Sequence, residues 1–140
     1  MKDVNRYTSN EFHDWQRDNL PDHFVIQDLD TWRIVFSNSS NDYEPLCLVE
    51  LKRSFYEPEQ WTPFHDDLPN YMALFKLAKK ANLPLVIIYF KKGKNLTDID
   101  TKLAIFKVSD VSKNNDDWIT YQKTIITSEK LKEEFPNILI

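Results

Sequence analysis

The chain is 140 residues long, which suits one domain and suffices to bury roughly 70% of the surface of the extended chain. Its net charge of −4 argues against a protein that coats nucleic acid by bulk attraction, while local binding stays open. The lone cysteine, Cys47, excludes a disulfide framework, and no apolar run nears the roughly 18 residues of a membrane span. Since no secretory signal is visible either, we expect a cytoplasmic protein without a membrane segment.

The first predicted element is a helix. Thr8-Ser9-Asn10-Glu11 matches a capping box, in which a hydroxyl and a glutamate three residues later bond the first backbone amides of a helix. Pro21 and Asp22 are typical of the residues that follow a helix. We therefore expect a helix from this box to about Asn19.

Two strand-like segments come next. Residues 23–36 are rich in β-branched and aromatic side chains but are interrupted near residues 27–30, which predicts two antiparallel strands or one bent strand. Residues 37–44 are polar or turn-forming and predict a loop. Residues 46–53, Leu-Cys-Leu-Val-Glu-Leu-Lys-Arg, predict a strand that starts apolar and ends charged.

The middle of the chain predicts a crossover between parallel strands. Asp66 or Asp67 is placed to cap a helix that has Pro69 in its first turn and ends near Asn82. The apolar run 85–90 is typical of a strand covered on both faces. A strand, a helix and a second strand in this order predict that the 46–53 and 85–90 strands are parallel.

The C-terminal part adds a strand and a helix. After a turn at Gly93, residues 102–108 predict a strand, and residues 110–122 show only loop character. Residues 128–135 predict a last helix that stops at Pro136. Together the elements predict a single α/β domain over residues 1–140, with a mixed central sheet flanked by helices.

The 46–53 strand ends in an acid and a base on one face. Alternate side chains of a strand share a face, so Glu50 and Lys52 project together. A carboxylate that holds a hard divalent cation and a lysine that orients or deprotonates water suit phosphodiester hydrolysis. A second carboxylate is needed to hold Mg²⁺ together with Glu50 and the Leu51 backbone carbonyl, and Asp28 and Asp30 have the same strand parity.

This arrangement resembles the PD-(D/E)XK nuclease superfamily over roughly residues 8–108. Asp30 stands directly before Thr31-Trp32-Arg33-Ile34-Val35-Phe36, and Glu50-Leu51-Lys52 follows after the loop. Leu29 takes the place of the proline that the family has before its acid. The resemblance favours Asp30 over Asp28, because Asp30 adjoins the strand in the order that the family shows.

The resemblance implies a restriction-endonuclease-like fold with an αβββαβ core. It also implies a nuclease that uses Mg²⁺ or Mn²⁺. In such a site Asp30, Glu50 and the Leu51 carbonyl hold the metal, and Lys52 orients or activates the attacking water.

Three more side chains are candidates for the same site. The family often adds an acid from the first helix, and Glu11 has that neighbourhood, although the capping box explains it as well. Relatives also place a polar residue on the helix after the motif, and Tyr71 is the candidate, although its helical spacing equally suits the core. Arg53, next to Lys52, can contact a phosphate bidentately.

The function expected from these residues is a metal-dependent endonuclease acting on nucleic acid, with DNA favoured over RNA. A homodimer is expected only by analogy with small nucleases that cut two strands. One alternative is an inactive nuclease-fold protein that binds a protein or nucleic-acid partner. Another is an α/β domain in which Glu50 and Lys52 form only a surface ion pair, worth about 0 to 1 kcal/mol.

Overall fold

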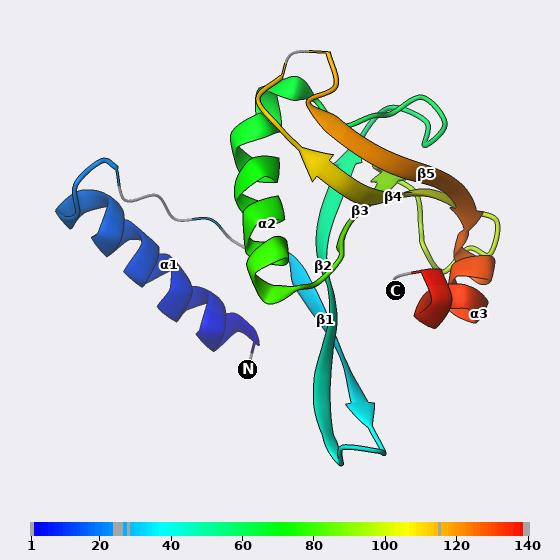
Figure 1. The fold of residues 1–140 in the computed structure, drawn as a ribbon, viewed down its shortest axis with the longest axis horizontal. Helices are drawn as coiled ribbons and strands as arrows, with labels where there is room; N and C mark the ends of the chain where they lie inside the picture. The colour runs from blue at the N-terminus through cyan, green and yellow to red at the C-terminus, as the bar shows by residue number, and fades with distance from the viewer. Residues whose placement is uncertain (1, 24–26, 28, 115, 139–140) are drawn as a thin grey trace.

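The computed structural model describes residues 2–23, 27, 29–114 and 116–138 (Figure 1). Three helices and five strands make up these parts of the chain. In chain order they are α1 (Lys2–Asn19), β1 (Thr31–Ser37), β2 (Asp42–Ser54), a 3-10 turn η1 (His65–Asp67), α2 (Leu68–Ala81), β3 (Leu85–Lys91), β4 (Lys102–Val111), β5 (Ile119–Thr127) and α3 (Ser128–Ile138).

The strands form one mixed sheet in the order β1-β2-β3-β4-β5. Only β2 and β3 run parallel, and they are joined through α2, which confirms the predicted crossover. The other neighbouring pairs are antiparallel. The predicted α/β architecture with a mixed central sheet is therefore confirmed.

The core lies on both faces of β3, because alternate residues of this strand point to opposite sides of the sheet. Ile87 and Tyr89 pack with Tyr71 of α2 on one face. Val86 and Ile88 pack on the other face in a cluster that Leu131 of α3 joins. All four β3 residues are buried, as the apolar run predicted for a strand covered on both sides.

Cys47 belongs to the α3 face, opposite Glu50. It is fully buried, and burial raises the pKa of its thiol. Cys47 is therefore a packing residue, because a buried thiol held in the protonated form is a poor nucleophile.

The β1–β2 hairpin projects beyond the rest of the sheet (Figure 1). It overturns one prediction, because the loop expected at 37–44 is only a tight turn, with β2 beginning at Asp42. Within the stretch 23–36, Thr31 to Phe36 belong to strand β1, while residues 24–26 and 28 lie outside the described residues. The turn is short because Asn41 adopts a left-handed φ of 55°, which asparagine tolerates better than most residues. Polar composition predicted a loop here, yet the turn needs only a few of these residues.

The first helix begins earlier than predicted. α1 starts at Lys2, so Thr8 to Glu11 lie inside it and the capping-box prediction is wrong, while its predicted end at Asn19 is confirmed. Figure 1 shows α1 apart from the sheet. Phe12 and Trp15 stack on each other at 6.0 Å and both stay exposed. Their narrow apolar stripe therefore does not join the core.

The C-terminal part holds a strand where a loop was predicted. β5 covers Ile119–Thr127 within the stretch given as 110–122 and beyond it. Its apolar residues Ile119 and Tyr121 alternate with polar ones, as expected of an edge strand with one covered face. α3 also continues past Pro136, because a proline near the end of a helix disrupts few backbone hydrogen bonds. Within the described residues, no helix is both long and apolar enough to cross a membrane.

Candidate active site at the end of β2

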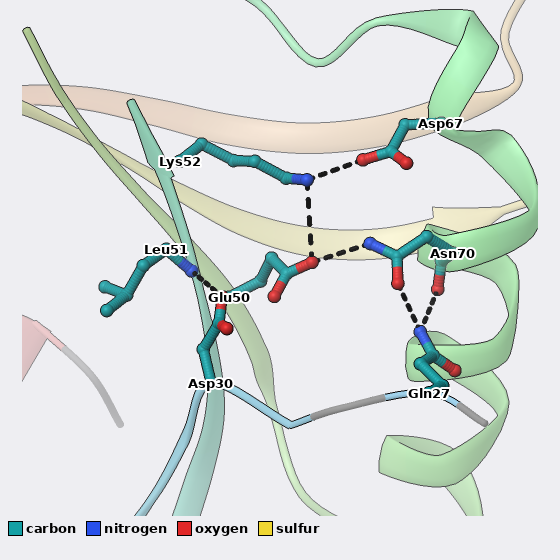
Figure 2. Close-up of polar contacts among 7 residues, drawn as sticks. All are labelled: Gln27, Asp30, Glu50, Leu51, Lys52, Asp67 and Asn70. Atoms are coloured by element: carbon teal, nitrogen blue, oxygen red, sulfur yellow. Dashed lines mark hydrogen bonds and ion pairs between the residues drawn. The ribbon is translucent and has the colours of Figure 1, made fainter. Parts of the chain in front are cut away.

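The register of β2 places Glu50 and Lys52 at an open edge of the sheet. The last pair between β1 and β2 is Thr31 with Val49, whereas pairing with β3 continues to Ser54. Glu50 and Lys52 share the face of Leu48, which packs against α2. Both charged side chains therefore point toward the start of α2, as Figure 2 shows.

Asp30 reaches this edge from the residue just before β1. Its Oδ2 accepts a hydrogen bond of 2.9 Å from the backbone N–H of Leu51. Its carboxyl is also near enough to the Glu50 carboxyl to raise the pKa of that group. The structure thus brings together the two acids that the sequence pattern paired, and Asp28 lies outside the described residues.

Glu50 is 6% exposed, which is unusual for a carboxyl group. Burial raises its pKa from 4.5 to about 7, and the hydrogen bond with Asp30 acts in the same direction. The Asn70 side chain and the Lys52 charge oppose this rise in pKa. Asn70 Nδ2 donates to Glu50 Oε2 at 2.6 Å, and Lys52 Nζ lies 3.7 Å from the same oxygen.

Lys52 is held between two carboxylates. Its Nζ lies 2.6 Å from Asp67 Oδ2, in addition to the longer contact with Glu50. The ammonium group also lies 5.3 Å from the centre of the Tyr71 ring. Glu50 and Lys52 are therefore more than a surface ion pair, because Glu50 is buried and Lys52 is largely covered.

Asp67 occupies the N-cap position of α2 as predicted, but its side chain makes no capping hydrogen bond. The carboxylate bonds Lys52 instead. A charged partner makes a stronger hydrogen bond than a neutral backbone amide, which explains the choice. Pro69 lies in the first turn of α2, and Asn82 follows its last residue, both as predicted.

Sequence reasoning missed Asn70, Gln27 and the link from Asp67 to Lys52. Gln27 Nε2 donates to the backbone carbonyl of Asn70 at 2.9 Å and also contacts the Asn70 side-chain oxygen. The segment before β1 is thereby joined to α2 (Figure 2). The available signal was spacing: residues three apart at the start of a helix share a face, so Asp67 and Asn70 reach β2 together.

The other candidates contribute less or lie elsewhere. Glu11 is exposed on α1, which lies apart from the sheet (Figure 1). Arg53 lies on the strand face opposite Glu50 and Lys52, and its guanidinium carbon is 5.8 Å from the centre of the Phe90 ring. Tyr71 is 1% exposed, and burial raises the pKa of its phenol, so it is a packing residue beside Lys52.

Among the described residues, Asp30 and Glu50 are the acids that lie together at this edge, while the third acid nearby, Asp67, is bonded to Lys52. No group of three or more histidine, cysteine, aspartate and glutamate side chains in these parts of the chain is arranged to hold a metal ion. Any cation at this edge would therefore need backbone or water ligands besides Asp30 and Glu50. Leu51 is placed to supply one, because the N–H and C=O of a residue in extended backbone point to the same side and its N–H points to Asp30.

The chain matches no protein-family model, no curated protein and no solved structure. The arrangement around Glu50 must therefore be interpreted from its own chemistry.

Proposed function

We propose that the chain is a divalent-metal-dependent nuclease that hydrolyses phosphodiester bonds, with a restriction-endonuclease-like active site. The observation that carries this proposal is the meeting of the Asp30 and Glu50 carboxyls beside the Lys52 ammonium group. These side chains come from two different segments, and of the two acids Glu50 is buried whereas Asp30 is exposed. Two neighbouring carboxyls need a shared proton or a cation to offset their repulsion.

The donor set fits Mg²⁺ or Mn²⁺. Hard cations take oxygen ligands, and Mg²⁺ commonly uses one or two carboxylates and keeps several waters. Asp30, Glu50 and the Leu51 carbonyl would hold the ion, leaving room for water and a phosphate oxygen. When bound, the ion would lower the pKa of a coordinated water and neutralise charge on the phosphate.

Lys52 is the residue proposed to orient or activate the attacking water. Asp67 and Glu50 hold its ammonium group from two sides, which limits the positions that Nζ can take. Asn70 orients Glu50 by donating to Oε2. Fixed geometry of this kind favours catalysis, since small displacements of reacting groups are costly.

The fold lends partial support. A helix, a strand directly preceded by Asp30, a Glu-x-Lys strand, a crossover helix and a parallel strand follow in the order that the nuclease superfamily shows. One described strand precedes the Glu-x-Lys strand where the αβββαβ core has two, and Glu11 is on a helix apart from the sheet. The proposed active site therefore draws on the β-sheet edge and α2.

Nucleic acid is the proposed partner, with DNA favoured over RNA by the resemblance. A homodimer that cuts two strands is a further expectation by analogy. The proposed setting is the cytoplasm, where a lone reduced cysteine is stable.

The test is cleavage of single-stranded DNA, duplex DNA and RNA in Mg²⁺ or Mn²⁺. Lys52→Ala should lower the cleavage rate by about 10² to 10⁴, the usual contribution of a positioned acid–base group. Lys91→Ala is the matched control, because Lys91 forms an ion pair of the same length, 2.6 Å, with Glu57. Equal cleavage by Lys52→Ala and wild type, or none by wild type, would contradict the proposal.

The second candidate function is a nuclease-fold protein that binds its partner without hydrolysis. The Lys52–Asp67 contact favours it, because an ammonium group already paired at 2.6 Å is less available to a water. Metal titration separates the two functions. A nuclease requires Mg²⁺ or Mn²⁺ binding that is lost in Glu50→Ala, whereas a binding module needs none.

A further inference from the structure

A pocket opens directly beside Lys52, at the end of β2. Its volume is about 330 Å³, and Lys52, Trp61, Phe64, Asp66, Asp67 and Tyr71 contribute to its lining. We call it the β2-end pocket. Small-molecule sites span roughly 300 to 1,000 Å³, so this pocket has room for one small ring system and not for a folded segment.

Part of the pocket is a rigid aromatic surface. Trp61 stacks on Tyr89 with ring centres 4.4 Å apart and planes 7° from parallel, and both rings are buried. The Tyr89 hydroxyl is in turn fixed by the carbonyl of Tyr56 at 2.7 Å and by Ser54 at 2.8 Å. A surface held in this way does not need to reorganise when a ligand arrives.

Phe64 contributes a solvent-exposed aromatic ring to the pocket. It is 52% exposed, although its ring lies 5.9 Å from that of Trp61 and 6.4 Å from that of Tyr56. These neighbours restrain the ring and leave much of it to solvent. An exposed, restrained aromatic ring is a platform on which a planar ligand stacks.

The charge of the pocket decides what kind of planar ligand fits. Two acids, Asp66 and Asp67, and two bases, Lys52 and Arg53, line it. The Lys52 charge is already engaged by Asp67 and Glu50, and the Arg53 guanidinium carbon lies 5.8 Å from the centre of the Phe90 ring, so the carboxylates are the hydrogen-bond acceptors that the charged lining offers. Carboxylates repel a phosphate but accept hydrogen bonds from N–H groups. A flat ring that carries amino or imino groups, as a nucleobase does, is complementary to this lining.

We propose that the β2-end pocket receives one unpaired nucleobase next to the phosphate that is cleaved. The inference rests on the proposed function for its choice of nucleic acid, since Lys52 borders both the pocket and the acid pair. A base inside a duplex is stacked and paired and cannot enter, so the substrate class is single-stranded nucleic acid or a duplex with an extruded base. Phe64 stacks on the base, and Asp66 accepts from its amino group.

The test measures binding without cleavage, in EDTA, by fluorescence anisotropy. The probes are a short single strand of deoxyadenosine, its thymidine counterpart and the duplex of the two. The deoxyadenosine strand should bind most tightly, because adenine carries an amino group and thymine does not, and the duplex should bind least tightly. Stacking contributes about 1 to 3 kcal/mol per base, so Phe64→Ala should weaken binding of the deoxyadenosine strand by about 5- to 150-fold.

Two further variants make the test specific. Phe55→Ala is the matched control, because Phe55 is 77% exposed and does not line the pocket, and it should leave affinity unchanged. Asp66→Ala should narrow the difference between adenine and thymine strands. Both Phe64 and Asp66 are exposed, so circular dichroism should show folded variants.

Several outcomes would overturn the inference. They are absence of single-strand binding by wild type, unchanged affinity in Phe64→Ala, an equal loss in Phe55→Ala, and a duplex that binds as tightly as the single strand. Because no metal is present, these results are separate from the cleavage test. If the chain binds unpaired bases through Phe64 but cuts no nucleic acid, the pocket proposal stands and the nuclease proposal fails. If it cuts nucleic acid but does not bind bases through Phe64, only the nuclease proposal stands.

Discussion

The two ends of β2 differ in an unusual way: aromatic side chains are exposed at one end, and a charged residue is buried at the other. At the hairpin end Tyr43 is 65% exposed, and its β1 neighbour Trp32 is 56% exposed. At the other end Glu50 is 6% exposed. Residues 42–45 of β2 pair with β1 alone, in the hairpin that projects beyond the rest of the sheet, whereas Glu50 pairs with β3 and contacts Asn70 of α2.

The difference shows that position in the sheet decides burial along this strand. A buried carboxyl group is costly unless it is hydrogen-bonded, and Glu50 has Asp30, Asn70 and Lys52 around it. These partners of Glu50 come from several segments of the chain, and the packing of the core does not require them. The aromatic side chains of the hairpin need no such partners, because they are exposed to water.

The largest effect expected from this comparison is on stability at the buried half of β2. Leu48 is 3% exposed and packs with Leu74 and Ala78 of α2. Leu48→Ala should lower the free energy of unfolding by about 2 to 5 kcal/mol, through lost apolar contact and the cavity left behind. Urea unfolding measures this change. A loss below about 1 kcal/mol would show that the α2 face of β2 is not packed as described.

Glu50→Gln should change the pH dependence of stability. The pKa of Glu50 is 4.5 unperturbed and about 7 in the fold, so the folded chain holds an extra proton between these values. Stability of the wild type in EDTA should therefore fall as the pH rises from about 4.5 to about 7, by roughly 3 kcal/mol. Above pH 7 the glutamine variant should be the more stable by a similar amount, because it mimics the protonated acid.

Unfolding in EDTA at pH 5 and pH 8 checks this prediction. Glu44→Gln is the control, since Glu44 is an exposed residue on the same strand. Parallel pH profiles for wild type and Glu50→Gln would contradict it. Added Mg²⁺ should reverse the loss at pH 8 if Asp30 and Glu50 hold the ion, because a ligand that binds only the folded chain stabilises it.

Asn70→Ala should lower stability by about 1 to 3 kcal/mol at pH 8, where Glu50 is charged and loses its amide donor. The loss should be smaller at pH 5, because a protonated carboxyl is less costly to leave unpaired. Urea unfolding of Asn70→Ala in the wild-type and Glu50→Gln backgrounds isolates the contact. Equal losses in both backgrounds would show that Asn70 acts through α2 and not through Glu50.

The smallest effect is expected at the hairpin. Tyr43→Ala should change the free energy of unfolding by no more than about 0.5 kcal/mol, because the ring is exposed and contacts mainly Phe36. The same unfolding experiment as for Leu48→Ala measures it. A loss near that of Leu48→Ala would mean that the hairpin is covered in solution, and the contrast between the two ends of β2 would disappear.

Parts of the fold were open to prediction because their signal is local. The apolar run of β3 and the amphipathic α2 between two strands predicted the parallel crossover. β5 was missed although its apolar and polar residues alternate, and the start of α1 was misplaced because a capping motif also occurs inside helices. Local patterns do not reveal which elements neighbour one another.

The sequence by itself determined which face of β2 carries Glu50 and Lys52, since strand alternation is a property of the backbone. Through its resemblance to a nuclease family, it also predicted Asp30 as the second carboxylate of the site. Only the tertiary structure decided that Asp30 meets Glu50, that Asp67 holds Lys52 and that Asn70 and Gln27 complete the set. The reason is physical: these contacts join segments 15 to 43 residues apart, and their geometry depends on how α2 packs against the sheet.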